Sequence, residues 1–130
     1  GTQVTAAHGH LAFFGAYVSL NLAIMTYAFP SLFRIGPYNQ ILNMASFWVM
    51  SSAMAFMTFV LTFAGAVQTH LQRVMGMNYM EVQDQLGVFY WMRFGAGVAV
   101  VLGVLLWVYA ILGPRTETRV APEGVMSPAE

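Results

Sequence analysis

Three long apolar segments constrain the fold of this chain more than any other feature of its sequence. They run roughly from Val4 to Phe29, from Ile41 to Leu71 and from Leu86 to Leu112. None of them contains Lys, Asp or Glu, and only Arg93 places a formal charge inside a segment. Each is longer than the ~20 residues that a helix needs to cross a hydrocarbon core about 30 Å thick. The sequence therefore predicts an all-α membrane protein with three transmembrane helices in a lipid bilayer.

The overall composition agrees with this fold class. Of the 130 residues, 58% are hydrophobic and only 8% are charged, whereas a soluble domain carries about 25% charged residues. The formal net charge is zero and all five basic residues are arginines, so no nucleic-acid partner is indicated. The chain has no cysteine, which excludes a disulfide scaffold and thiolate metal sites.

Polar stretches between and after the segments suggest how the chain is organised. We expect residues 1–113 to form one three-span unit and residues 114–130 to form a disordered tail. Pro30 is expected to end the first span, and a short loop with Arg34 follows it. The chain starts at Gly1 without the charged beginning of a signal peptide. We therefore expect its N-terminus to be a cut into a longer polypeptide.

The arginines that flank the spans predict the orientation in the membrane. Arg34, Arg115 and Arg119 lie on one side, whereas Arg73 lies on the other. Because cytoplasmic loops carry the excess of basic residues, we expect the first loop and the C-terminus to be cytoplasmic. The N-terminal end of this chain then faces outward.

Two histidines stand near the start of the first span, in TAAHGHLAFFGAY. Residues of an α-helix advance by about 100° each, so His8 and His10 point to nearly opposite faces and cannot share one metal ion. The spacing instead suits one helix that serves two sites. Neutral imidazole is a common axial ligand of haem iron, and ionisable groups within a membrane span are functional candidates by default.

The residues along the two faces are compatible with two different interpretations. Small residues recur on the His8 face and aromatic rings (Phe13, Phe14 and Tyr17) on the His10 face. A flat cofactor on each side explains them, and so does close packing with interhelical hydrogen bonds. Gly9 between the histidines indicates that something approaches the backbone there. The two opposed histidines favour cofactor ligation over a structural role, but the spacing alone does not identify haem.

Three further residues are polar or charged near the outer surface. Arg73 is a candidate cofactor-binding residue, because guanidinium matches a carboxylate such as a haem propionate, although it also suits an interface anchor. His70 is interpreted as an interfacial polar group. Arg93 either acts like Arg73 or pairs with Asp84, and the sequence leaves this choice open.

Four sequence elements together resemble a known family. They are TAAHGHLAFFGAY, the span ending in YAFP, AVQTHLQR and DQLGVFYWMRFGAGV. These elements look like the C-terminal part of the large subunit of cytochrome c-dependent nitric oxide reductase, a twelve-helix member of the haem–copper oxidase superfamily. The resemblance implies that the three spans are the last three helices of such a bundle.

The resemblance also implies roles for the two histidines. His8 matches the proximal ligand of the high-spin haem b at the catalytic centre, and His10 matches one axial ligand of the low-spin haem b. The implied reaction reduces NO to N2O in denitrification, in the bacterial inner membrane, with electrons from a membrane-anchored cytochrome c subunit. The region of Arg73 matches one near the haem propionates.

The resemblance leaves other requirements unmet by this chain. The ligands of the non-haem iron and the second ligand of the low-spin haem belong to earlier helices of the family, so the N-terminal remainder of the large subunit must supply them. The chain alone is therefore expected to be inactive. Two alternatives remain open: an oxygen-reducing relative, against which Gly9 argues weakly, and a non-catalytic three-helix scaffold subunit.

Overall fold

The computed structural model describes residues 2–33 and 38–113. The part of the first loop around Arg34 and the predicted disordered tail, residues 114–130, lie outside the described residues.

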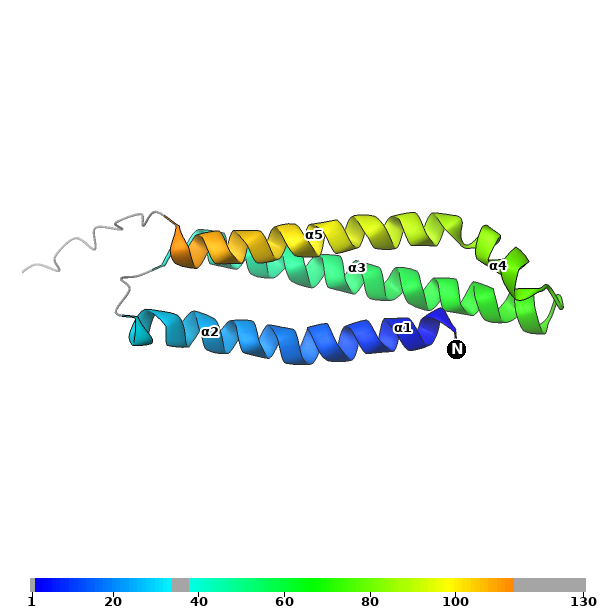
Figure 1. Cartoon of the computed structure of the whole chain (residues 1–130), viewed down its shortest axis with the longest axis horizontal. Helices are drawn as coiled ribbons and strands as arrows, with labels where there is room; N and C mark the ends of the chain where they lie inside the picture. Colours follow the sequence, from blue (N-terminus) through cyan, green and yellow to red (C-terminus); the bar gives the residue numbers. More distant parts are fainter. Residues whose placement is uncertain (1, 34–37, 114–130) are drawn as a thin grey trace, which may run out of the picture.

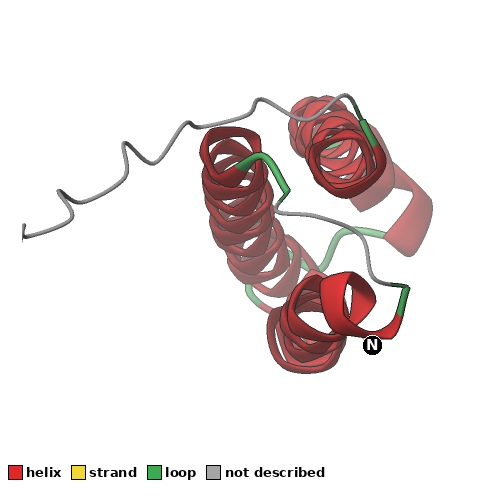
Figure 2. Cartoon of the chain, turned by 90° about the vertical axis from the view of Figure 1, so that its left-hand side faces the viewer, coloured by secondary structure: helices red, strands yellow, loops and turns green. Residues whose placement is uncertain are grey.

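Three helical rods run side by side along the long axis of the molecule (Figure 1). All three are long and apolar enough to cross a membrane, which confirms the predicted all-α class with three spans. Figure 2, a view along the helices, shows that the rods do not lie in a single layer. The first rod contains α1 (Gln3–His10), the π-helix η1 (Leu11–Val18) and α2 (Ser19–Leu32); the second is α3 (Gln40–Arg73) and the third is α5 (Gly87–Leu112).

The first rod differs from the prediction at Pro30. The helix does not stop there but continues through Pro30 to Leu32. Proline removes one helical hydrogen bond, and its ring crowds the carbonyl four residues earlier, but neither effect prevents the chain from continuing as a helix near its end. The amide of Phe33 still donates to the carbonyl of Phe29 at 3.1 Å, so the last turn remains closed.

A short helix, α4 (Tyr79–Gln85), lies in the polar stretch before the third rod. The backbone N–H of Asn78 donates to Glu81 Oε2 at 3.2 Å, as part of a capping box. The Asn-x-x-Glu spacing is the sequence signal that predicts such a helix start. Val82 of α4 is fully buried against α3 and α5, so α4 closes the end of the bundle near the N-terminus (Figure 1).

The second rod, α3, is the centre of the packing. It carries most of the buried residues, whereas no residue of α2 is buried. Small residues let the helices approach closely, as is usual where there is little hydrophobic force between membrane helices. A Cβ on Gly65 would lie 2.5 Å from the backbone nitrogen of Val4, and one on Gly103 would lie 3.3 Å from that of Met50.

Candidate functional site

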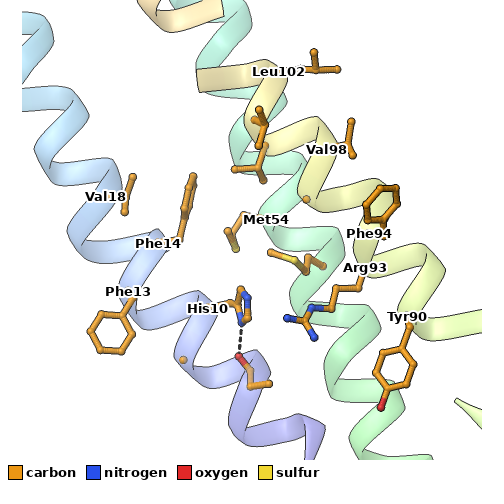
Figure 3. A pocket seen from close by; sticks show the side chains of 16 residues that line it. His10, Phe13, Phe14, Val18, Met54, Tyr90, Arg93, Phe94, Val98 and Leu102 are labelled. Atoms are coloured by element: carbon orange, nitrogen blue, oxygen red, sulfur yellow. Dashed lines mark hydrogen bonds between the residues drawn. The ribbon is translucent and has the colours of Figure 1, made fainter. Parts of the chain in front are cut away.

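A groove of about 1140 Å³ opens between the first rod, α3 and α5. Its volume is slightly above the ~300–1,000 Å³ range of small-molecule and cofactor sites. Most of its lining is apolar and includes Phe13, Phe14 and Met57. The groove also contains His10, Tyr90 and Arg93, which lie at one end, whereas Val98 and Leu102 lie towards the other (Figure 3).

The His10 side chain is half-buried and held in one orientation. Its Nδ1 lies 2.7 Å from the carbonyl oxygen of Ala6, one turn earlier. A carbonyl oxygen can only accept, so Nδ1 carries the proton and donates it. Nε2 is then the basic nitrogen, and it makes no hydrogen bond to any residue that the structure describes. A backbone carbonyl on one ring nitrogen is the usual way in which proteins orient a histidine that binds metal through the other.

His8 lies in different surroundings. Its side chain is exposed, it lines neither cavity and it makes no hydrogen bond within the described ranges. Ala7, between the two faces, is 2% exposed and packs against α3. The imidazole of His8 is therefore free to meet a group that lies outside this chain, whereas His10 faces this chain's own helices.

The π-helix directly after His10 changes which of the following residues lie on the same side of the helix as His10. In η1 each hydrogen bond spans one residue more than in an α-helix: the amide of Ser19 donates to the carbonyl of Phe14, five residues earlier. Regular α-helical spacing predicts Tyr17 on the His10 face, and this is wrong. Val18 lines the groove instead, and Tyr17 is 63% exposed.

Arg93 enters the same groove from α5. It is half-buried and lies six residues into a helix long and apolar enough to span a membrane. The pairing with Asp84 that the sequence left open does not form, because Asp84 is exposed and no ion pair involving Arg93 exists among residues 2–33 and 38–113. The guanidinium points from α5 towards His10 (Figure 3).

A chain of side-chain hydrogen bonds closes the end of the bundle next to Arg93. Gln3 Nε2 donates to Tyr90 Oη at 3.1 Å, and Tyr90 Oη donates to Gln83 Oε1. The backbone N–H of Gln3 donates to Oε1 of Gln68, which is 1% exposed. This network, which the sequence analysis missed, ties the start of α1 to α3, α4 and α5. It therefore fixes the helix turn that presents His10.

The other two residues singled out near the outer surface lie apart from the groove. Arg73 is the last residue of α3 and His70 lies one turn before it; both are exposed and line neither cavity. The structure therefore brings His10 and Arg93 into one groove, and it leaves His8 and Arg73 outside it.

A second cavity, of about 630 Å³, lies between α2, α3 and α5. It contains Thr26 Oγ1, which accepts from Trp107 Nε1 at 2.9 Å and donates to the carbonyl of Leu22 at 2.7 Å. These groups satisfy one another, and none of the candidate histidines and arginines lines this cavity.

The residues of the groove can hold a group that brings its own additional ligands. Within the described chain, no three His, Cys, Asp or Glu side chains come together in a way that could hold a metal ion. A single well-oriented imidazole instead fits a metal whose equatorial ligands belong to a macrocycle, as in haem. The aromatic and aliphatic lining suits such a planar apolar group.

Comparison with known proteins agrees with this chemistry. Residues 1–99 match the family described as Cytochrome C and Quinol oxidase polypeptide I. The chain is also 40% identical over 137 aligned residues to a nitric oxide reductase subunit of Stutzerimonas stutzeri. This alignment covers 99% of the chain and 28% of the relative, so the chain spans just over a quarter of that protein's length. The resemblance predicted from the sequence is confirmed: the chain belongs to the Cytochrome C and Quinol oxidase polypeptide I family.

Proposed function

We propose that this chain is part of the large subunit of a membrane-bound nitric oxide reductase, which reduces NO to N2O with electrons from a c-type cytochrome. In it, His10 is one axial ligand of a low-spin haem b. The observation that carries the proposal is the His10 ring, with Nδ1 engaged by the Ala6 carbonyl at 2.7 Å and Nε2 left for a ligand in the groove.

His8 takes the second role, as the proximal ligand of a high-spin haem b at the catalytic centre. Its exposure supports this, because an imidazole without a partner in its own chain can serve a site built with helices from the rest of the enzyme. The relative is a much longer protein, which is where the non-haem iron ligands and the second ligand of the low-spin haem would reside. Arg73, at the outer end of α3, stays a predicted contact for a propionate.

The two histidines give the chain its part in the reaction. When bound, the haems supply reversible one-electron redox chemistry and the iron to which NO coordinates. The protein holds each iron by one imidazole on opposite sides of the same helix turn. The α1 backbone between His8 and His10 is then a short covalent path between an electron-delivering and an NO-reducing site. The network around Gln3 keeps this turn in place against α3 and α5.

We further propose the bacterial inner membrane as the location, with the N-terminal end of this chain facing the periplasm. The ends of α2 and α5 lie together at the opposite end of the bundle from α4 (Figure 1). The basic flanking residues of that end support a cytoplasmic position for it. A membrane-anchored cytochrome c subunit is the proposed electron-donating partner.

The test compares His10→Ala with His70→Ala in the assembled enzyme. His70 is a matched control because it is an exposed histidine that lines neither cavity. His10→Ala should lose the low-spin haem absorbance and the EPR signal of a six-coordinate haem, and N2O production should stop. His70→Ala should keep both. A His10→Ala enzyme with a normal low-spin spectrum would overturn the ligand assignment. If the unmodified enzyme consumed oxygen and produced no N2O, the oxygen-reducing alternative would be favoured.

A further inference from the structure

Arg93 is a charged side chain that has no ion-pair partner among residues 2–33 and 38–113. It lies within a helix long and apolar enough to span a membrane, it is half-buried, and it lines the His10 groove. No carboxylate reaches it within the described ranges. The acidic residues nearest in sequence, Glu81 and Asp84, are both exposed at the bundle end.

A guanidinium in such a position requires an anionic partner. A charged side chain within a membrane span is costly, and such residues almost always pair or line a polar cavity. The groove offers little such compensation, because most of its lining is apolar and includes Phe94, Gly97 and Met57. An occupant of the groove that carries a negative charge would supply this partner for Arg93.

Tyr90, the other polar residue at this end of the groove, cannot take this role. Its hydroxyl proton goes to Gln83 Oε1, and its oxygen already accepts from Gln3 Nε2. It has no second proton to donate to an anion. Among the residues lining the groove, Arg93 is thus the one that offers a formal positive charge.

We propose that Arg93 binds a propionate carboxylate of the haem held at His10, and that its charge raises the reduction potential of that haem. The inference rests on the proposed function, because it needs a haem on His10. It moves the expected propionate contact from Arg73, which lines neither cavity, to an arginine that points towards His10 (Figure 3). A guanidinium also matches the two oxygens of a carboxylate.

The sign of the effect follows from the charges. Oxidation adds one positive charge to the haem, and the Arg93 guanidinium repels that charge. Arg93 therefore disfavours the oxidised form and raises the reduction potential. Removing the guanidinium, or leaving the propionate charge unneutralised, acts in the opposite direction and lowers it.

The experiment uses the assembled enzyme with haem labelled with carbon-13 at the propionate carboxyl carbons. Arg93→Gln, Arg93→Lys and Arg73→Gln are compared with Met92→Leu, a neutral change on α5 at a residue that is 45% exposed and lines neither cavity. A spectroscopic redox titration gives the potential of the low-spin haem. Redox-induced infrared difference spectra identify the carboxylates that sense the change, because only the labelled bands belong to the haem.

We expect Arg93→Gln to raise the oxidised-to-reduced ratio of the low-spin haem at a fixed potential at least tenfold, which is about 59 mV for one electron, and to shift the labelled bands. Arg93→Lys keeps the charge, so it should shift the labelled bands with less than half that change in potential. It also provides the readout if the Gln variant does not assemble. Met92→Leu should change neither quantity.

Three outcomes would overturn the inference. In the first, Arg93→Gln changes only unlabelled bands, so that an acidic side chain from the rest of the enzyme is the partner. In the second, neither Arg93 variant changes a labelled band or the potential. In the third, Arg73→Gln alone moves the labelled bands. All three leave the proposed function standing, because the loss of the low-spin spectrum in His10→Ala tests that separately.

Discussion

On one side of the first helix, the His10 imidazole donates to a backbone carbonyl and faces a groove that α3 and α5 of the same chain help to form. On the other side, two residues earlier, the exposed His8 imidazole has no hydrogen-bonding partner within residues 2–33 and 38–113. The two residues share a helix turn and a residue type. The difference comes from what packs beside each face: helices of this chain line the groove at His10, whereas the His8 side chain is exposed.

The largest effect should come from removing one histidine at a time. His8→Ala should lower N2O production by more than about a hundredfold, since losing a ligand costs more than the ~10–100-fold of a change behind the ligand. The low-spin haem spectrum should persist, because His10 and its groove do not involve His8. Rates of N2O formation and the low-spin absorbance of the same sample give both values. Loss of both haems in His8→Ala would contradict the conclusion that the His10 groove does not depend on His8.

The next test moves the whole helix turn. In Gly65→Ala the new Cβ would meet the backbone nitrogen and the side chain of Val4, each at 2.5 Å. Because backbone must move, we expect a destabilisation of about 1–3 kcal/mol and a lower temperature for loss of the low-spin haem absorbance. Gly95→Ala, on α5, is the control, since a Cβ there meets nothing within 4 Å. Equal behaviour of the two variants would show that α1 does not depend on this close contact.

A smaller effect should come from the network that fixes α1 on the groove side. Tyr90→Phe leaves Gln3 Nε2 and Gln83 Oε1 without their partner, and an unsatisfied buried polar group costs about 1–3 kcal/mol. Gln83 Nε2 is already buried without a hydrogen-bond partner in the described part of the chain, which makes this end of the bundle sensitive. We expect faster hydrogen exchange at the start of α1 in mass spectrometry. Unchanged exchange there would mean that packing against α3 alone fixes the helix.

The smallest effect concerns Gly9, which separates the two faces. A Cβ on Gly9 meets nothing within 4 Å, and alanine favours a helix over glycine by about 1 kcal/mol in a soluble reference. If no cofactor or other helix approaches Gly9, Gly9→Ala should stabilise α1 slightly and leave both haem spectra unchanged. We expect instead a small shift of the low-spin haem absorbance, because Gly9 lines the groove. An unshifted spectrum would remove the case for a close approach there.

The spans were predictable because their signal is local. Uninterrupted apolar length is enough to identify a transmembrane helix, and the predicted segments differ from the observed helices by at most three residues at each end. The Asn78-x-x-Glu81 spacing is a local signal for the start of α4 as well, although the sequence analysis did not use it. The opposition of His8 and His10 also follows from helix geometry alone.

What the sequence could not reveal depends on contacts between distant residues. The assignment of Arg93 rather than Arg73 to the His10 groove follows from the packing of α5 beside the first rod, two elements that are far apart along the chain. Val18 lines the groove in place of Tyr17 because of the π-helical hydrogen bonds of η1. The hydrophobic pattern of the sequence does not predict these hydrogen bonds.

The sequence by itself thus determined the membrane class, the three spans and the two histidine faces, because each of these follows from hydrophobic length or from the period of one helix. Only the tertiary structure decided which face is closed by this chain, which nitrogen of His10 is left for a ligand and which arginine shares its groove. These depend on side-chain orientation and on helix packing, where small residues such as Gly65 set how closely the helices approach.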